Sequence, residues 1–208
     1  MIPFTDLQSQ YKECKKEIDD SIKRVLESSS YITGPIVEEV EKSLIEYTGA
    51  EACATCGSGT TALQIALKAC KIGPSDEVIT VSHTFVSTPE AIVNVGATPI
   101  FVDIDALYHI NLDQIEKSIN SRTKAILFVD LYGQTPDIDK LKKIASKNNL
   151  YLIEDAAQSF GYKYKDKMVG SLVDITCVSF NPVKNLGAIG DAGCVLGKKD
   201  LVDKARMY

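Results

Sequence analysis

The sequence predicts an α/β fold, with a seven-stranded, mostly parallel sheet and helices on both faces. Two observations support this prediction. Short apolar runs alternate with helical patterns along most of the chain. The runs are apolar at consecutive positions, which is typical of strands that helices cover on both sides. The seven runs lie at residues 52–55, 77–81, 99–102, 124–129, 150–154, 174–180 and 192–197.

The segment before the first strand is predicted to be helical. Apolar residues recur at steps of three and four over residues 7–25, which places them on one stripe of a long amphipathic helix that needs a partner surface. A second helix begins at Pro35, because proline suits the first helical position, and Gly49 ends it. We therefore predict two parts: a helical segment and loop over residues 1–35, which packs on one large domain over residues 36–208.

Helices are also predicted in four of the connections between strands. Their expected ranges are 62–71, 89–95 with Thr88 as its cap, 111–119, and 136–147 with Thr135 as its cap. The connection from the sixth strand to the seventh carries no helical pattern, so we predict that the seventh strand is antiparallel. Residues 162–167 alternate tyrosine with charged residues, and we predict a solvated hairpin there.

Composition argues against several classes of function. With 208 residues, of which 45% are hydrophobic, the chain can bury a sizeable core. A formal net charge of -5 with scattered basic residues argues against binding to nucleic acid or to an anionic membrane. No run approaches the roughly 20 apolar residues of a membrane span, and residues 1–16 contain no signal-peptide pattern. We expect a cytoplasmic protein.

The cysteine pattern predicts free thiols and no metal site. Six cysteines lie mostly within apolar runs, as free thiols do in a reducing compartment. Cys53 and Cys56 form a single CxxC pair, and neither His83 nor His109 has a metal-like spacing. Structural zinc needs four ligands, so this pair alone does not predict one.

A glycine-rich turn after the first strand predicts a phosphate site. Ligands in open α/β sheets bind beyond the carboxyl ends of the strands, and residues 57–62 read Gly-Ser-Gly-Thr-Thr-Ala there, leading into a helix. The glycines let a ligand approach the backbone, and the free amides of the helix start attract an anion. A dinucleotide fold is the alternative, but it requires an acidic residue at the end of the second strand, where residues 80–83 read Thr-Val-Ser-His. The pattern favours a smaller phosphorylated cofactor.

Four further side chains are expected at the same edge. Phe85 follows the second strand and can cover a flat ring, or it can belong to the core. Asp155 ends the fifth strand, where a buried carboxylate needs a cation such as a protonated ligand nitrogen, unless it caps the following turn. The sixth strand ends at Ser179 and leads to Lys184, whose small and apolar neighbours favour a partly desolvated, nucleophilic amine. A solvated loop lysine fits this last stretch equally well. Together these groups fit pyridoxal 5'-phosphate.

A set of motifs extends along essentially the whole chain. They are Ile2-Pro3-Phe4-Thr5-Asp6-Leu7, Gly34-Pro35, Gly57-Ser58-Gly59-Thr60, Gly96-Ala97-Thr98-Pro99, Asp103-Ile104-Asp105, Glu154-Asp155-Ala156-Ala157-Gln158 and Lys184-Asn185-Leu186-Gly187. In these motifs the chain resembles the DegT/DnrJ/EryC1/StrS family of sugar aminotransferases, within the fold type I pyridoxal-phosphate enzymes.

The resemblance implies a role for each of seven candidate residues. Lys184 would bind the cofactor covalently and Asp155 would pair with its pyridine nitrogen, and these two are the expected catalytic residues. Gln158 would approach the phenolic oxygen of the cofactor, and Phe85 would stack on its ring. The phosphate would be held by backbone amides and one hydroxyl, from Gly59, Thr60 and Ser179.

The same resemblance implies a homodimeric enzyme that moves an amino group from glutamate to a nucleotide-linked keto sugar, in amino-sugar and surface-glycan biosynthesis. Segments 185–188 and 190–193 are similar to members that aminate the 3-keto position. Family members are nearly twice as long and carry a small C-terminal domain, which we expect to be absent here. Two alternatives stay open: a sugar dehydratase, in which a histidine replaces the lysine, and a non-catalytic scaffold or partner subunit of the same fold.

Overall fold

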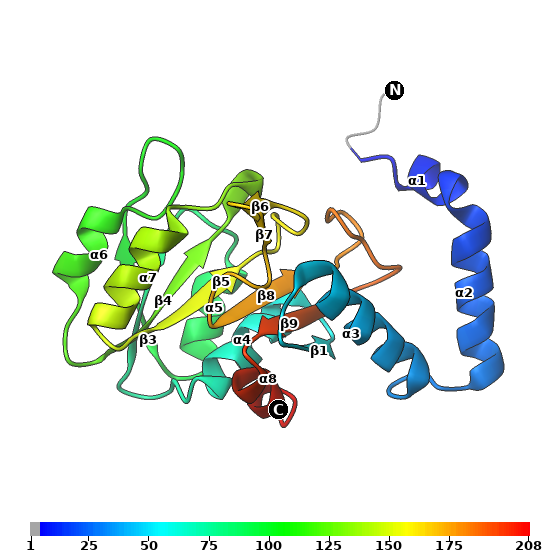
Figure 1. Cartoon of the computed structure of the whole chain (residues 1–208), viewed down its shortest axis with the longest axis horizontal. Helices are drawn as coiled ribbons and strands as arrows, with labels where there is room; N and C mark the ends of the chain where they lie inside the picture. Colours follow the sequence, from blue (N-terminus) through cyan, green and yellow to red (C-terminus); the bar gives the residue numbers. More distant parts are fainter. Residues whose placement is uncertain (1–4) are drawn as a thin grey trace.

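The computed structural model describes residues 5–208 and centres on a seven-stranded sheet with the order β1-β9-β8-β5-β4-β2-β3 (Figure 1). All neighbouring strands are parallel except β9, which is antiparallel to both β1 and β8. The predicted sheet is confirmed, including its antiparallel seventh strand. The bounds are β1 (Ala52–Cys56), β2 (Glu77–Val81), β3 (Thr98–Val102), β4 (Thr123–Val129), β5 (Tyr151–Asp155), β8 (Ile175–Ser179) and β9 (Gly193–Gly197).

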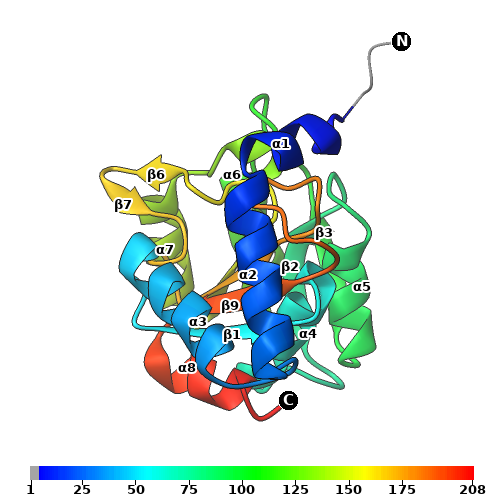
Figure 2. The same cartoon turned by 90° about the vertical axis from the view of Figure 1, so that its right-hand side faces the viewer.

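Helices cover both faces of this sheet. Their bounds are α3 (Pro35–Thr48), α4 (Gly59–Ala69), α5 (Ser87–Asn94), α6 (Leu112–Ser118), α7 (Ile138–Lys147) and α8 (Lys199–Ala205), with a short 3-10 turn η1 (Leu131–Gly133). α4 contacts α5 and α8, whereas α6 contacts α7. Figure 2 shows α7 on one side of the sheet and α4 and α5 on the other. The predicted hairpin is also present, as β6 (Lys163–Tyr164) paired with β7 (Lys167–Met168).

Two predicted helix caps are wrong. α5 begins at Ser87, so Thr88 lies inside its first turn, where its hydroxyl donates to a buried carboxylate of Asp155 at 2.8 Å. α7 is capped by Asp137, whose side chain accepts from the Lys140 amide, because Asp137 stands directly before the helix while Thr135 precedes a proline.

The predicted helix over residues 7–25 is two helices. α1 (Leu7–Glu13) and α2 (Lys15–Ser28) meet at Cys14, whose backbone departs from helical geometry at φ -108° and ψ 18°. Neither helix contains a buried residue, and both stand apart from the sheet in Figure 1. Arg24 links α2 to α3 through an ion pair with Glu39 at 3.0 Å. The packing of residues 1–35 on the large domain therefore stays a prediction. Residues 1–4 of that segment, and with them most of the Ile2–Leu7 motif, lie outside the described residues.

The cysteines are free thiols, and four of them are buried in the core. Burial raises the pKa of the Cys56 thiol to about 11, so it stays protonated at neutral pH. Over residues 5–208, no group of three or more histidine, cysteine or acidic side chains is arranged to hold a metal ion. No helix in the same range is both long and apolar enough to cross a membrane.

Arg206 connects α8 to α3 by an ion pair and to β1 by a hydrogen bond. Arg206, at the end of α8, donates two hydrogen bonds to Glu41 of α3, at 3.1 and 2.8 Å, and a third to the carbonyl of Cys53 in β1. Burial raises the pKa of Glu41, but the hydrogen bonds from Arg206 and Thr55 outweigh this effect and hold the pKa below its ordinary value. The stabilisation is thus present above the unfolded-state pKa and disappears as the pH falls through the lowered folded-state value.

We expect Arg206→Gln to lower the free energy of unfolding by about 1–3 kcal/mol at neutral pH, because it leaves the buried Glu41 carboxylate without its cation. Urea denaturation measures this. The control is Lys204→Gln, which removes an exposed pair with Asp200 and should change stability by less than about 0.5 kcal/mol. Equal losses of stability from the two substitutions would contradict the stabilising role of the Arg206–Glu41 pair.

Candidate active site

One cavity of about 450 Å³ opens at the carboxyl ends of the parallel strands. All seven residues predicted for the site line it: Gly59, Thr60, Phe85, Asp155, Gln158, Ser179 and Lys184. They come from four separate stretches of the chain, which the strand order of the sheet brings to one edge. The structure therefore brings the predicted residues together, and their individual roles stay proposals.

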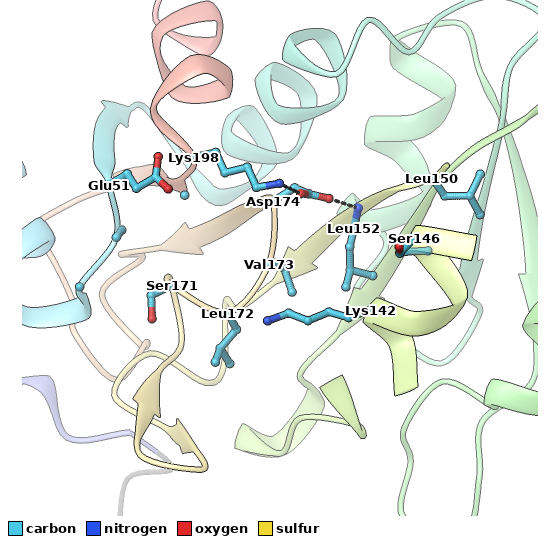
Figure 3. A pocket seen from close by; sticks show the side chains of 14 residues that line it. Glu51, Lys142, Ser146, Leu150, Leu152, Ser171, Leu172, Val173, Asp174 and Lys198 are labelled. Carbon is cyan, nitrogen blue, oxygen red and sulfur yellow. Dashed lines mark hydrogen bonds and ion pairs between the residues drawn. The ribbon is translucent and has the colours of Figure 1, made fainter. Parts of the chain in front are cut away.

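A second cavity, of about 520 Å³, lies at the opposite edge of the sheet. Figure 3 shows its lining, with the side chain of Lys142 extending from α7 and an ion pair between Lys198 and Asp174 at 2.5 Å. It contains none of the seven predicted residues. Ligands of open α/β sheets bind at the carboxyl edge, so the smaller cavity is the candidate active site.

The start of α4 presents hydrogen-bond donors at one end of the cavity. Ser58 caps the helix by accepting from the Thr61 amide at 3.1 Å. The amides of Gly59 and Thr60 belong to the first turn, where no intrahelical acceptor exists. The hydroxyl of Thr60 lies 2.8 Å from that of Ser87, and Ser179 is packed against Gly59. These donors suit the phosphate of a cofactor. Sequence reasoning missed Ser87, because it comes from α5 and no motif marks it.

Gly59→Ala tests the close packing at this end. A Cβ at position 59 would lie 2.7 Å from the Cβ of Ser179, so the helix start and β8 must move apart. We expect the affinity for pyridoxal phosphate to fall about tenfold or more, measured by equilibrium dialysis. Gly57→Ala is the matched control, because no atom lies within 4 Å of its added Cβ. An equal loss of affinity for pyridoxal phosphate in both variants would contradict the prediction.

Asp155 is a buried carboxyl at the end of β5. Its Oδ2 accepts from the Thr88 hydroxyl at 2.8 Å, and its Oδ1 accepts from the Ala157 amide at 3.2 Å. Burial raises the pKa of Asp155, while the Thr88 hydrogen bond and the charge of Lys184 act in the opposite direction. The pKa of Asp155 is raised, and no side-chain cation within residues 5–208 is hydrogen-bonded to it, so this buried carboxyl suits a ligand that carries a protonated nitrogen.

Lys184 lies in the loop between β8 and β9 and is half-buried. This loop folds back tightly: the Lys184 amide donates to the Asn181 carbonyl at 2.8 Å, and the Asn181 side chain donates to Asp191 at 2.8 Å. A Cβ at Gly187 would lie 2.5 Å from the carbonyl oxygen of Pro182, so the turn requires glycine there. The backbone of this turn thus fixes the position from which the Lys184 side chain extends.

Gln158 and Phe85 complete the lining of the cavity. The Gln158 Oε1 accepts from the backbone amide of Tyr132 at 2.8 Å, which leaves its NH₂ group to donate to a ligand oxygen. Phe85 is 69% exposed at the cavity. An aromatic side chain so exposed favours the predicted role as a ring cover over the alternative of a core residue.

A comparison with protein-family models matches residues 12–208 to the DegT/DnrJ/EryC1/StrS aminotransferase family. The chain belongs to this aminotransferase family. The motifs of the sequence thus identified the family correctly.

Two curated relatives of this aminotransferase family are named sugar aminotransferases. The UDP-2-acetamido-2-deoxy-3-oxo-D-glucuronate aminotransferase of Pseudomonas aeruginosa is 46% identical over 96% of this chain and 56% of its own length. The dTDP-3-amino-3,4,6-trideoxy-alpha-D-glucose transaminase of Streptomyces venezuelae is 40% identical over 99% of this chain and 55% of its own. The chain therefore spans about half the length of these relatives.

Two solved structures share the fold. The S. venezuelae protein DesV, in complex with a ketimine intermediate, aligns with a TM-score of 0.96 at 39% identity, over 99% of this chain and 56% of its own. NtdA from Bacillus subtilis, with bound cofactor PMP, aligns with a TM-score of 0.91 at 35% identity, over 98% of this chain and 47% of its own. The fold is that of the type I pyridoxal-phosphate aminotransferases.

Pyridoxal 5'-phosphate is the cofactor of this aminotransferase family. The cavity described above fits it at both ends. The unpaired first-turn amides of α4 suit the phosphate, and the buried carboxyl of Asp155 suits the ring nitrogen. Lys184 lies in the wall of the same cavity, and its amine suits the aldehyde of such a cofactor.

Proposed function

We propose that this chain is the cofactor-binding part of an aminotransferase that transfers an amino group from glutamate to the keto group of a nucleotide-linked sugar, in amino-sugar and surface-glycan biosynthesis. The placement of Lys184 and Asp155 in the walls of one cavity, with a phosphate-suited helix start beside them, carries the proposal. The names of the relatives point to carbon 3 of the sugar as the position that receives the amine.

When bound, pyridoxal phosphate supplies an aldehyde that takes up the amino group and a ring that accepts the electrons released from the donor carbon. Asp155 keeps a proton on the ring nitrogen through a charge-assisted hydrogen bond, and Thr88 holds the carboxylate in place from the other side. Lys184, once its amine is free, would take the proton from the donor carbon as general base and, as general acid, give it to the carbon that was the aldehyde of the cofactor. Ser179 and the start of α4 hold the phosphate, so that the reacting atoms stay within reach of Lys184.

We also propose a cytoplasmic homodimer. Three apolar side chains surround Lys184 on its loop and are exposed in the single chain: Val183 at 61%, Leu186 at 48% and Ile189 at 73%. Exposed apolar side chains that gather beside a cavity are typical of a surface that another chain covers. A second copy placed there would exclude water from the amine.

A covalent labelling experiment tests the proposed function. The protein is incubated with pyridoxal phosphate, reduced with borohydride, digested, and analysed by mass spectrometry. We expect the reduced adduct on the peptide that contains Lys184. Lys142→Ala, which removes the lysine at the second cavity, should leave this adduct unchanged. An adduct spread over surface lysines, with none at Lys184, would overturn the proposal.

A further inference from the structure

Three aromatic side chains gather outside the cofactor cavity. The ring of His83 stacks on that of Tyr108, with centroids 5.5 Å apart and planes at 25°. Tyr132 meets Tyr108 edge to face at 5.5 Å, and its hydroxyl lies 3.3 Å from the Nε2 of His83. His83 is exposed, as are Tyr108 at 49% and Tyr132 at 60%. We call His83, Tyr108 and Tyr132 the aromatic platform.

The platform adjoins the wall of the cavity. His83 immediately precedes Thr84, and Tyr132 immediately follows Leu131, and both neighbours line the cavity. The Tyr132 amide also donates to Gln158, a third residue of that wall. A molecule that projects out of the cavity on this side therefore meets these rings.

Two of the three rings belong to residues with a strained backbone. Tyr108 has φ of 67° and Tyr132 has φ of 60°, values that bulky residues rarely adopt. Hydrogen bonds support the loop around Tyr108, because the Asp105 side chain accepts from the amides of Leu107 and His109. Strained residues held in place by surrounding hydrogen bonds are typical of ligand-binding positions.

We propose that the aromatic platform binds the base of the nucleotide-linked substrate, an inference that rests on the proposed function. Every base has a flat face that can stack on an exposed aromatic ring. Tyrosine offers such a ring, with an apolar face and a polar tip. His83, which contacts both tyrosines, can hydrogen bond to a carbonyl or ring nitrogen of a base. The sugar then extends toward Lys184, and the diphosphate lies between the cavity and the platform.

The test compares two ligands on the protein incubated with pyridoxal phosphate. Uridine 5'-diphosphate carries a base, whereas inorganic pyrophosphate carries the same two phosphates without one. We expect equilibrium dialysis to show about tenfold tighter binding of uridine diphosphate. Tyr132→Asn should remove this advantage, because asparagine tolerates the positive φ of this position while deleting the ring. Tyr132→Phe, which keeps the ring, should retain it.

Tyr162→Asn is the control, since Tyr162 is exposed but belongs to the hairpin region and not to the platform. Equal binding of the two ligands by the unchanged protein, or an unchanged advantage in Tyr132→Asn, would overturn the inference. Labelling of Lys184 is measured on the same samples. Its failure would overturn the proposed function, whereas normal labelling without a base-dependent advantage would overturn the aromatic platform alone.

Discussion

Lys184→Ala is expected to slow the conversion of glutamate to 2-oxoglutarate by about 10²- to 10⁴-fold, the range typical for loss of a general acid–base group. Under the proposed function the donor proton then has no amine beside it, although Asp155 and the proposed phosphate donors still line the cofactor cavity. Single-turnover kinetics with stoichiometric cofactor measure the rate.

Chemical rescue makes this prediction specific. A small primary amine such as ethylamine, added to Lys184→Ala, fits the space that the lysine leaves and should restore part of the rate. The same amine should not accelerate Lys142→Ala, in which the cavity is unchanged. A Lys184→Ala protein with normal turnover would contradict the assignment of the lysine as the proton carrier.

Asp155→Asn is expected to act in opposite directions on turnover and on stability. Turnover should fall by about 10²- to 10³-fold, because an amide cannot hold the ring nitrogen in its protonated form. The cofactor-free protein should become more stable at neutral pH, because the substitution removes a buried acidic group. Single-turnover kinetics and urea denaturation measure the two effects.

The pH dependence of stability checks the same residue. Burial raises the folded-state pKa of Asp155, so between the unfolded and folded pKa values the folded chain keeps a proton that the unfolded chain has lost. The contribution of Asp155 to the free energy of unfolding of the cofactor-free protein therefore falls as the pH rises through this window. The free energy of unfolding of Asp155→Asn should therefore fall less, or rise more, across this window than that of the unchanged protein. Asp166→Asn, in an exposed turn, should show the same pH dependence as the unchanged protein. Parallel curves for all three would contradict the prediction.

The strands and the site could be predicted from the sequence because their signals are local. A buried strand reads as a continuous apolar run, and β1, β2 and β4 were recognised in this way. The site residues follow directly after such runs, so the common edge of a parallel sheet brings Asp155, Ser179 and Lys184 together.

The remaining features depend on contacts between distant residues. Thr88 reads as a helix cap, yet its hydroxyl is engaged by Asp155, 67 residues away. The apolar stripe continues through Cys14, so nothing in the pattern marks the break between α1 and α2. The aromatic platform combines three connections of the sheet, and positive φ angles at tyrosine have no sequence signature.

The strand order of the sheet determines when the sheet can form during synthesis on the ribosome. Within residues 5–208, β1 pairs only with β9, so the residue pair Cys56 and Gly193 joins segments that lie far apart in the sequence. Until β9 emerges, β1 cannot take its place in the sheet. The turn that follows β1 also lacks the close approach of Gly193, where an added Cβ would lie 2.6 Å from the backbone of Ser58. Incomplete chains that end before β9 should thus expose an open sheet edge to chaperones. We therefore expect the chain to bind pyridoxal phosphate only after β9 has been translated.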